Sequence, residues 1–270
     1  MNLLAPMNDT SAIAEWPFGA QPLQEENLPL LAAVVAGDLE TVELLAPIEA
    51  RKKNADGHTA LMLAAFFGNA ACVERLLPFS DIDAQDEHGE CALSCAAGEG
   101  FAECVALLAP IADATLLNDR GRTPLMQAAV MGHADVIRVL ARASDANLQG
   151  SHGYTALMWA VCDQQHACIE ALLPASDAKI ISDHGRMAID LAAEREDWRA
   201  ADLLAEKSPR DKAQAVFELA GPHAEENMPR WAAKLAAEEL SAAIRLASKD
   251  KGKSESPHAT PTIQGRKSRL

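Results

Sequence analysis

Apolar residues recur along this chain at helical spacing, within a phrase that is repeated at a fixed step. The clearest copy is NDRGRTPLMQAAVMG, at 118–132, in which Leu125 and Ala129 lie on one helical face. Thr123 is suited to cap the start of this helix, because its hydroxyl can accept a backbone N–H. Gly132 is suited to end it, because glycine tolerates a left-handed backbone. The pattern predicts a short amphipathic helix between these two residues.

Four further copies of the phrase surround this one. The turn glycines of the five copies stand at positions 57, 89, 121, 153 and 185, so every step is 32 residues. A second apolar stripe follows each of the first four copies, with a branched residue three positions before a leucine: Val73/Leu76, Val105/Leu108, Ile137/Leu140 and Ile169/Leu172. One hairpin of two short helices cannot bury its apolar side alone, whereas stacked hairpins can. The pattern therefore predicts an all-α solenoid that is stabilised by the interfaces between neighbours.

The repeated phrase resembles the ankyrin repeat. The T-P-L-H-x-A-A box of that family corresponds to TPLMQAA, which begins at Thr123, and the turn and the second helix with V-x-x-L-L are also similar. The resemblance covers roughly Asn27–Lys207, and we place an array of about six repeats at residues 23–207. The first repeat has no Gly-Thr turn before its first helix, which is typical of a terminal cap.

Three kinds of substitution depart from the family's pattern. Cys91 and Met187 replace the capping threonine, which predicts weaker helix starts. Gln164 and Glu196 replace the glycine that closes the first helix, where a left-handed residue would cost stability. Methionine or serine replaces the box histidine, whose usual hydrogen bonds to the loop would be missing. These replacements are Met62, Ser94, Met126 and Met158.

The two ends of the chain lack the repeat. Residues 1–22 are expected to form a flexible arm. Residues 208–249 are expected to form a helical extension, which we interpret either as a degenerate repeat that caps the array or as a separate docking helix. Asn27 and Asn227 each precede a proline by two residues and are interpreted as helix N-caps. Residues 250–270 are polar and without periodicity, which predicts a disordered basic tail.

The charge of the chain limits its partners. The formal net charge is −15, with 24 Lys and Arg against 39 Asp and Glu. Such an acidic body binds duplex nucleic acid poorly and is repelled by anionic membranes. The longest apolar run, Leu28–Ala36, is too short to span a bilayer, and the first ten residues do not resemble a secretion signal. We therefore expect no nucleic-acid or membrane partner, and a cytoplasmic location.

The residues that could carry chemistry favour no catalytic or metal site. The six cysteines lack metal-ligand spacing, and we interpret them as small core residues. His58, His88, His152 and His184 flank turn glycines, and neighbouring turns about 10 Å apart would keep two imidazoles from sharing one zinc. We expect these histidines to lie in solvated loops or to contact a partner. Neither a phosphate-binding loop nor a nucleophile motif is present, so the sequence predicts no enzyme and no cofactor.

The positions that vary between copies indicate a protein-binding surface. The resemblance implies that the turn tips and the ends of the first helices line one concave face. Aromatic and arginine side chains are the usual anchors of protein interfaces. Trp159 stands beside a buried leucine and is interpreted as core. The candidate partner-binding residues are Phe66, Phe67, His88, Glu90, Arg120, Arg122, Met131, His152, Tyr154, Asp163, His184 and Arg186.

The sequence thus favours a non-enzymatic adaptor or scaffold that binds another protein, with a basic patch on the partner as the counterpart of the acidic surface. One alternative is a translocated bacterial effector, in which the array binds a host protein and the basic tail is the export signal. A second alternative places an enzyme site in 208–249, although that region has no cysteine and one histidine, His223. The final Ser-Arg-Leu resembles a peroxisomal address, and also a C-terminal peptide for a carboxylate-binding domain.

Overall fold

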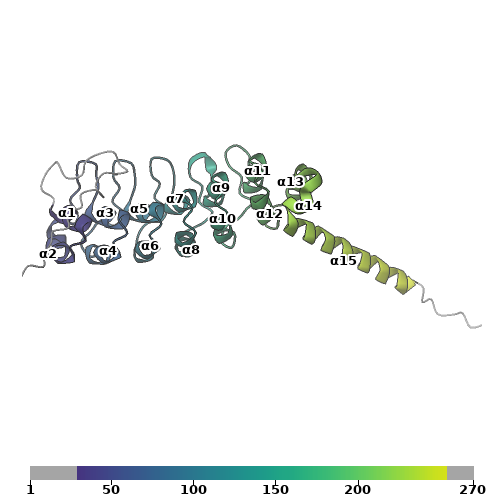
Figure 1. The fold of residues 1–270 in the computed structure, drawn as a ribbon, viewed down its shortest axis with the longest axis horizontal. Coiled ribbons are helices and arrows are strands. Elements are labelled where there is room, and N and C mark those ends of the chain that lie inside the picture. The colour runs from purple at the N-terminus through teal and green to yellow at the C-terminus, as the bar shows by residue number, and fades with distance from the viewer. Residues whose placement is uncertain (1–28, 254–270) are drawn as a thin grey trace, which may run out of the picture.

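The computed structural model describes residues 29–253 of the 270-residue chain. The described part is an elongated stack of helices with no named strand, and its long axis runs from α1 to α15 (Figure 1). The expected flexible arm at 1–22, the proposed cap Asn27 and the end of the basic tail lie outside the described residues. Of the stretch 250–270, residues 250–253 belong to the last helix.

Six helical hairpins form the body of the stack, as the sequence predicted. Their first helices are α1 (Pro29–Ala36), α3 (Ala60–Phe66), α5 (Ala92–Glu99), α7 (Pro124–Met131), α9 (Ala156–Cys162) and α11 (Ala188–Glu194). Their second helices are α2 (Leu39–Glu49), α4 (Ala70–Leu76), α6 (Ala102–Leu108), α8 (Ala134–Ala143), α10 (His166–Leu172) and α12 (Trp198–Ala205). First helices contact first helices and second helices contact second helices along the stack. The two rows form a helical solenoid without a central globule.

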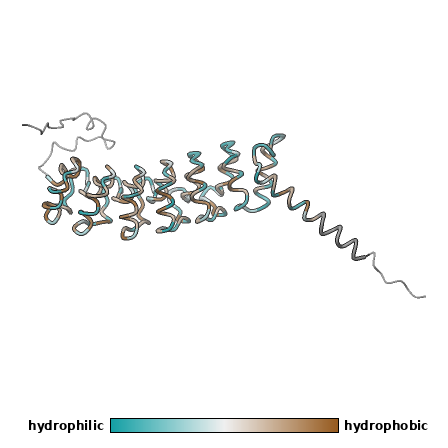
Figure 2. The backbone as a smooth tube through the Cα atoms, turned by 60° about the horizontal axis from the view of Figure 1, so that its bottom comes forward, coloured by the Kyte–Doolittle hydropathy of each residue, from teal (hydrophilic) through white to brown (hydrophobic). Residues whose placement is uncertain are grey.

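The core is one continuous layer between the two rows. In each central hairpin the predicted pair, such as Val105 and Leu108, is fully buried, and alanines of the first helix pack beside it. Hydrophobic stretches therefore recur in every hairpin along the stack (Figure 2). Cys72, Cys104 and Cys168 are also fully buried at equivalent positions, which confirms that they are core residues.

The helix starts follow the predicted caps, with a compensation that the sequence analysis missed. Thr123 Oγ1 accepts the N–H of Met126 at 3.3 Å, and Thr59 and Thr155 cap their helices in the same way. Cys91 makes no such cap, but Ser94 Oγ accepts the Cys91 N–H at 2.8 Å. A residue that replaces the box histidine, such as Ser94, can therefore accept a hydrogen bond from the backbone N–H of the cap residue.

The helix α11 shows the same compensation. Met187 provides no side-chain cap, but Asp190 Oδ2 accepts the Met187 N–H at 3.0 Å. Lys212, in the helix Arg210–Leu219, donates to both oxygens of Asp190, at 3.0 and 3.2 Å. The expected weak starts of α5 and α11 are thus partly offset by the side chain three residues into each helix.

The turn tips form a ladder of backbone hydrogen bonds between neighbouring hairpins. Three of its N–H···O bonds run from Asp119 to His88, from Ser151 to Gly121 and from Asp183 to His152, at 2.8–3.0 Å. This ladder fixes the tips at one edge of the stack, so that equivalent residues of successive hairpins lie in rows.

The C-terminal extension continues the stack. The helix α13 (Arg210–Leu219) packs against α11 and α12, and α15 (Pro229–Lys253) begins against α12. Between them lie the 3-10 turn Gly221–His223 and α14 (Ala224–Asn227). Trp231 is buried at this junction. The extension therefore packs on the last hairpin through α13 and the start of α15, while the rest of α15 projects away from the body (Figure 1).

The proposed cap of the last helix was wrong. Asn227 is the last residue of α14, and the first N–H groups of α15 point to another helix. Asp202 of α12 accepts the N–H of Trp231 at 2.9 Å and that of Arg230 at 3.2 Å. A carboxylate at a helix N-terminus is favourable because it meets unpaired N–H groups and the positive end of the helix dipole. The cap is tertiary and could not be found from local sequence.

Gln164 and Glu196 adopt the left-handed backbone that the sequence predicted, with φ of 54° and 56°. Replacing either residue with glycine is expected to stabilise the protein by about 1 kcal/mol, because the strain from the β-carbon is removed. Urea unfolding of the full chain measures the change. Asp163→Gly is the matched control, because Asp163 precedes Gln164 and has φ of −101°. A gain as large at Asp163 would contradict the argument from strain.

Candidate protein-binding surface

The turn tips and the first helices form one side of the stack, which we call the tip face. The 32-residue step places equivalent side chains in rows along it, and some members of each row are buried. One row holds the residue before each helix cap: His58, Glu90, Arg122, Tyr154 and Arg186. A second row holds the fourth residue after each cap: Leu63, Cys95, Gln127, Trp159 and Leu191. The backbone that carries these rows is regular, so their chemistry changes along the stack while their spacing does not.

The second row was missed by the sequence analysis. Trp159 was interpreted as core, but it is only half-buried and packs at the edge of the core. The signal that could have identified this row is its variation through Leu, Cys, Gln, Trp and Leu, next to a column that is leucine or isoleucine in all five copies. The row lies at the edge of the core, because its other four members are buried and only Trp159 is half-buried.

Arg122 and Trp159 form the centre of the tip face. The guanidinium carbon of Arg122 lies 4.3 Å from the centroid of the indole ring, within the range of a cation–π contact. Tyr154 meets the same indole edge-on, with ring centroids 5.3 Å apart. Burial, together with Arg120, lowers the pKa of Arg122, while Asp163 and Glu90 act in the opposite direction. Arg122 Nε and Trp159 Nε1 are buried and have no hydrogen-bond partner.

A groove of about 450 Å³ opens beside this centre, between α3, α5 and α7. Five candidate residues line it: Phe66, His88, Glu90, Arg120 and Met131. Glu99, Asp119 and Gln127, which are not among the twelve candidates, also line the groove. The carboxylates among these side chains outnumber the single guanidinium.

The other candidate residues also lie on the tip face, but they differ in exposure and in whether another side chain already binds them. Phe67 is 40 % exposed and meets Phe66 edge-on at 5.3 Å, which confirms that the two adjacent rings cannot both enter the core. Asp163 is exposed at the end of α9. Arg186 forms an ion pair with Glu194. The partner-binding role of all twelve candidates stays a prediction.

The expected separation of the tip histidines was wrong. The rings of His152 and His184 stack with centroids 5.9 Å apart, because their side chains lean toward each other across the turn ladder. His152 itself has a left-handed backbone, with φ of 60°. Other turns are closed by a side chain: Asn118 Oδ1, for example, accepts the N–H groups of Arg120 and Arg122. The equivalent residue here is Gly150, which has no side chain to do this.

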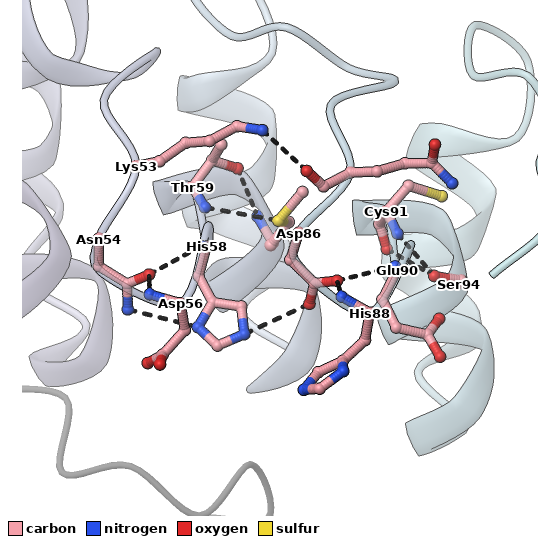
Figure 3. Close-up of polar contacts among 12 residues, drawn as sticks. Lys53, Asn54, Asp56, His58, Thr59, Asp86, His88, Glu90, Cys91 and Ser94 are labelled. Atoms are coloured by element: carbon pink, nitrogen blue, oxygen red, sulfur yellow. Dashed lines mark hydrogen bonds and ion pairs between the residues drawn. The ribbon is translucent and has the colours of Figure 1, made fainter. Parts of the chain in front are cut away.

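His58 was expected at a solvated tip, and this was wrong. Its side chain is 2 % exposed and lies between Asn54 and Asp86, so that it joins two neighbouring hairpins (Figure 3). Asn54 Oδ1 accepts the N–H groups of Asp56 and His58, so Asn54 Nδ2 donates to His58 Nδ1 at 3.3 Å. The neutral imidazole then carries its proton on Nε2, which lies 3.3 Å from Asp86 Oδ2.

Asp86 completes this contact and also closes its own turn. Its Oδ1 accepts the N–H groups of His88 and Glu90 at 2.8 and 2.9 Å. Burial raises the pKa of Asp86, but the neighbouring His58 ring and the hydrogen bonds from the Glu90 and His88 N–H groups outweigh burial, so the pKa lies below the ordinary 3.8. A lowered pKa means that the ionised carboxylate contributes stability above pH 4.

The cysteines do not form a reactive or metal-binding group in the structure. Burial raises the pKa of the Cys104 and Cys168 thiols to about 11, so both stay protonated near neutral pH. Within residues 29–253 no three His, Cys, Asp or Glu side chains are placed to hold a metal ion. No helix in this part of the chain is long and apolar enough to cross a membrane.

A family model described as "Ankyrin repeats (3 copies)" matches the chain in four overlapping segments, at residues 8–86, 30–117, 61–150 and 107–183. These segments cover more than half of the chain. The chain belongs to the ankyrin repeat family. Members of this family are protein–protein interaction modules and are generally not catalytic.

Solved structures with the same fold include the ankyrin repeat domain of Bcl-3, described as a unique member of the IkappaB protein family. It has a TM-score of 0.60 and 25% identity, over 65% of this chain and 81% of that one. The ankyrin repeat protein EF0377 has a TM-score of 0.61 and 24% identity, over 68% of this chain and 99% of that one. No curated protein matches the sequence. The comparisons therefore establish the scaffold and leave the partner open.

The contact between His58 and Asp86 predicts an acid-sensitive part of the stability. Asp86→Asn keeps an oxygen for the turn, as Asn54 and Asn118 do at the equivalent positions, but removes the carboxylate that faces His58. At pH 7 the variant is expected to lose about 1–2 kcal/mol of unfolding free energy.

The pH dependence gives the control for this prediction. Because the native pKa of Asp86 is lowered, the wild-type advantage is present above pH 4 and shrinks as the pH falls below 3.8 through the native pKa. Urea unfolding of both proteins between pH 7 and pH 3 measures it. An advantage that is absent at pH 7, or that is the same at pH 3, would contradict the assigned role of Asp86.

Proposed function

We propose that this ankyrin repeat chain is a non-enzymatic adaptor or scaffold, and that its partner protein binds across the tip face. The observation that carries the proposal is the pair of Arg122 and Trp159. Both side chains sit at the surface of a rigid stack, and each keeps a buried N–H donor without an acceptor. Aromatic and arginine side chains in such settings are the usual hot spots of interfaces. A partner carbonyl or carboxylate would supply the missing acceptor after a small side-chain rotation.

The arrangement of the tip face also supports an elongated contact. The turn ladder and the packed first helices hold the rows in place, so binding costs little conformational entropy of the backbone. Phe66, Met131 and Tyr154 offer apolar area on three of the hairpins, those of α3, α7 and α9, and the polar tips surround them. We therefore place the partner along several repeats and not on one hairpin.

A rival apolar surface exists on the first repeat. Leu44 and Ile48 of α2 are 73 % and 74 % exposed, on the row of second helices opposite the tip face. This patch belongs to a single helix and lacks the aromatic and arginine side chains that mark the centre of the tip face. We favour the tip face for this reason, and the patch provides the control below.

We place the protein in the cytoplasm, with no nucleic-acid or membrane partner, because its body is acidic. The alternative of a translocated bacterial effector depends on the basic tail. Most of that tail lies outside the described residues, so no structural observation favours export. Deletion of 249–270 followed by an export assay separates the two proposals.

Photo-crosslinking maps the partner surface directly. A photoreactive residue at Met131 or Tyr154 in the full chain is expected to capture the partner, and the same residue at Leu44 is expected not to. Arg122→Ala and Phe66→Ala should each weaken partner binding by about tenfold, because truncation of an interface anchor costs 1–2 kcal/mol or more. The matched control is Arg138→Ala, an exposed arginine of α8 in the second-helix row. Circular dichroism confirms that each variant is folded.

Capture at Leu44 without capture at Met131 or Tyr154 would overturn the placement. If wild type, Arg122→Ala and Phe66→Ala bind the partner equally well, Arg122 and Phe66 are not the anchors of the interface.

A further inference from the structure

The groove on the tip face carries an excess of negative charge at a defined place. Three carboxylates line it, from Glu90, Glu99 and Asp119, against the one guanidinium of Arg120. Glu90 is held in position, because its Oε1 accepts a hydrogen bond from Asn118 Nδ2 at 2.7 Å. The other oxygen of Glu90, Oε2, is buried and has no partner. The groove therefore presents one carboxylate that is fixed at one oxygen and unpaired at the other.

A second unpaired acceptor lies on the same groove. Gln127 of α7 is 7 % exposed, packs close to Gly98 of α5, and lines the groove. Its Oε1 has no hydrogen-bond partner. A buried acceptor without a donor costs about 1–3 kcal/mol, which is regained when a ligand supplies an N–H. Because the terminal amide of glutamine rotates easily, Gln127 can turn this oxygen toward an incoming donor.

We propose that this groove binds an arginine side chain of the partner protein. The inference rests on the proposed function, because it names the chemistry that the partner places on the tip face. A guanidinium offers five N–H groups in one plane, enough to serve Glu90 and Gln127 together, and its charge complements Glu99 and Asp119.

The walls of the groove favour arginine over other side chains. Phe66 and Met131 provide apolar surface at its edge, and Met131 is 46 % exposed. A guanidinium is planar and weakly hydrated, so it packs against such surface at a lower desolvation cost than the ammonium of lysine. A neutral amide lacks the charge that three carboxylates select, and an acidic side chain would be repelled. The partner segment is therefore a basic one, with an arginine beside a residue that contacts Met131.

The test uses the full chain and a minimal probe, N-acetyl-arginine amide. The protein carries a ¹³C methyl label on methionine, and the Met131 methyl signal is assigned by its loss in Met131→Leu. Titration with the probe is expected to shift the Met131 signal saturably. N-acetyl-citrulline amide has nearly the same shape without the charge, and it should bind at least tenfold more weakly. N-acetyl-lysine amide should fall between the two.

Two variants test the individual contacts. Gln127→Leu removes the unpaired acceptor and should weaken probe binding about fivefold. Glu99→Gln removes an exposed charge at the groove and should weaken it about threefold. The matched control is Glu74→Gln on the exposed side of α4, which makes the same change of charge away from the groove and should leave binding unchanged.

The outcomes separate this inference from the proposed function. Absence of a Met131 shift, equal binding of arginine and citrulline amides, or unchanged binding by both Gln127→Leu and Glu99→Gln would overturn the arginine site. Crosslinking of the partner at Met131 would still support the tip face in that case. Crosslinking only at Leu44 would overturn the proposed function whatever the probe does.

Discussion

The structure depends on the burial of small apolar side chains between neighbouring hairpins. Each hairpin has two short helices, and α3, α4, α6, α9 and α10 have only seven residues each. Helices of this length are not stable alone in water. They persist because alanines and leucines of one hairpin meet those of the next, and the last hairpin is covered by the C-terminal extension. At the C-terminal end this cover is α13 with the start of α15, where Asp202 caps the helix and Trp231 closes the core.

The same stacking sets the geometry of the tip face. Because the core residues hardly vary, the backbone repeats its geometry, and the rows on the tip face become a regular set of positions for variable side chains. Arg122 with Trp159 offers hydrogen-bond donors, while Glu90 of the α5 hairpin and Gln127 of α7 offer acceptors. A partner that crosses these hairpins meets two surfaces of opposite hydrogen-bonding character, and this alternation would fix its register.

The sequence was sufficient to predict the fold, and it failed where a side chain reaches across to another hairpin. The 32-residue step determined the solenoid, and the missing glycines at Gln164 and Glu196 correctly marked left-handed residues. His58 was placed in solvent because its turn position is exposed, but its ring reaches Asp86 of the next repeat. The stacking of His152 with His184, and the cap from Asp202, are contacts of the same kind. The interpretation of Trp159 as core holds in part, because the side chain packs against the core but is only half-buried.

Hydrogen exchange of the full chain with Leu108→Ala tests the dependence on stacking most directly. Leu108 is fully buried in α6, and its truncation should cost about 2–5 kcal/mol. If stability comes from the interfaces, the amides of α4 and α8 should lose protection together with those of α6. Loss of protection in α6 alone, with α4 and α8 exchanging as in the wild type, would contradict the account.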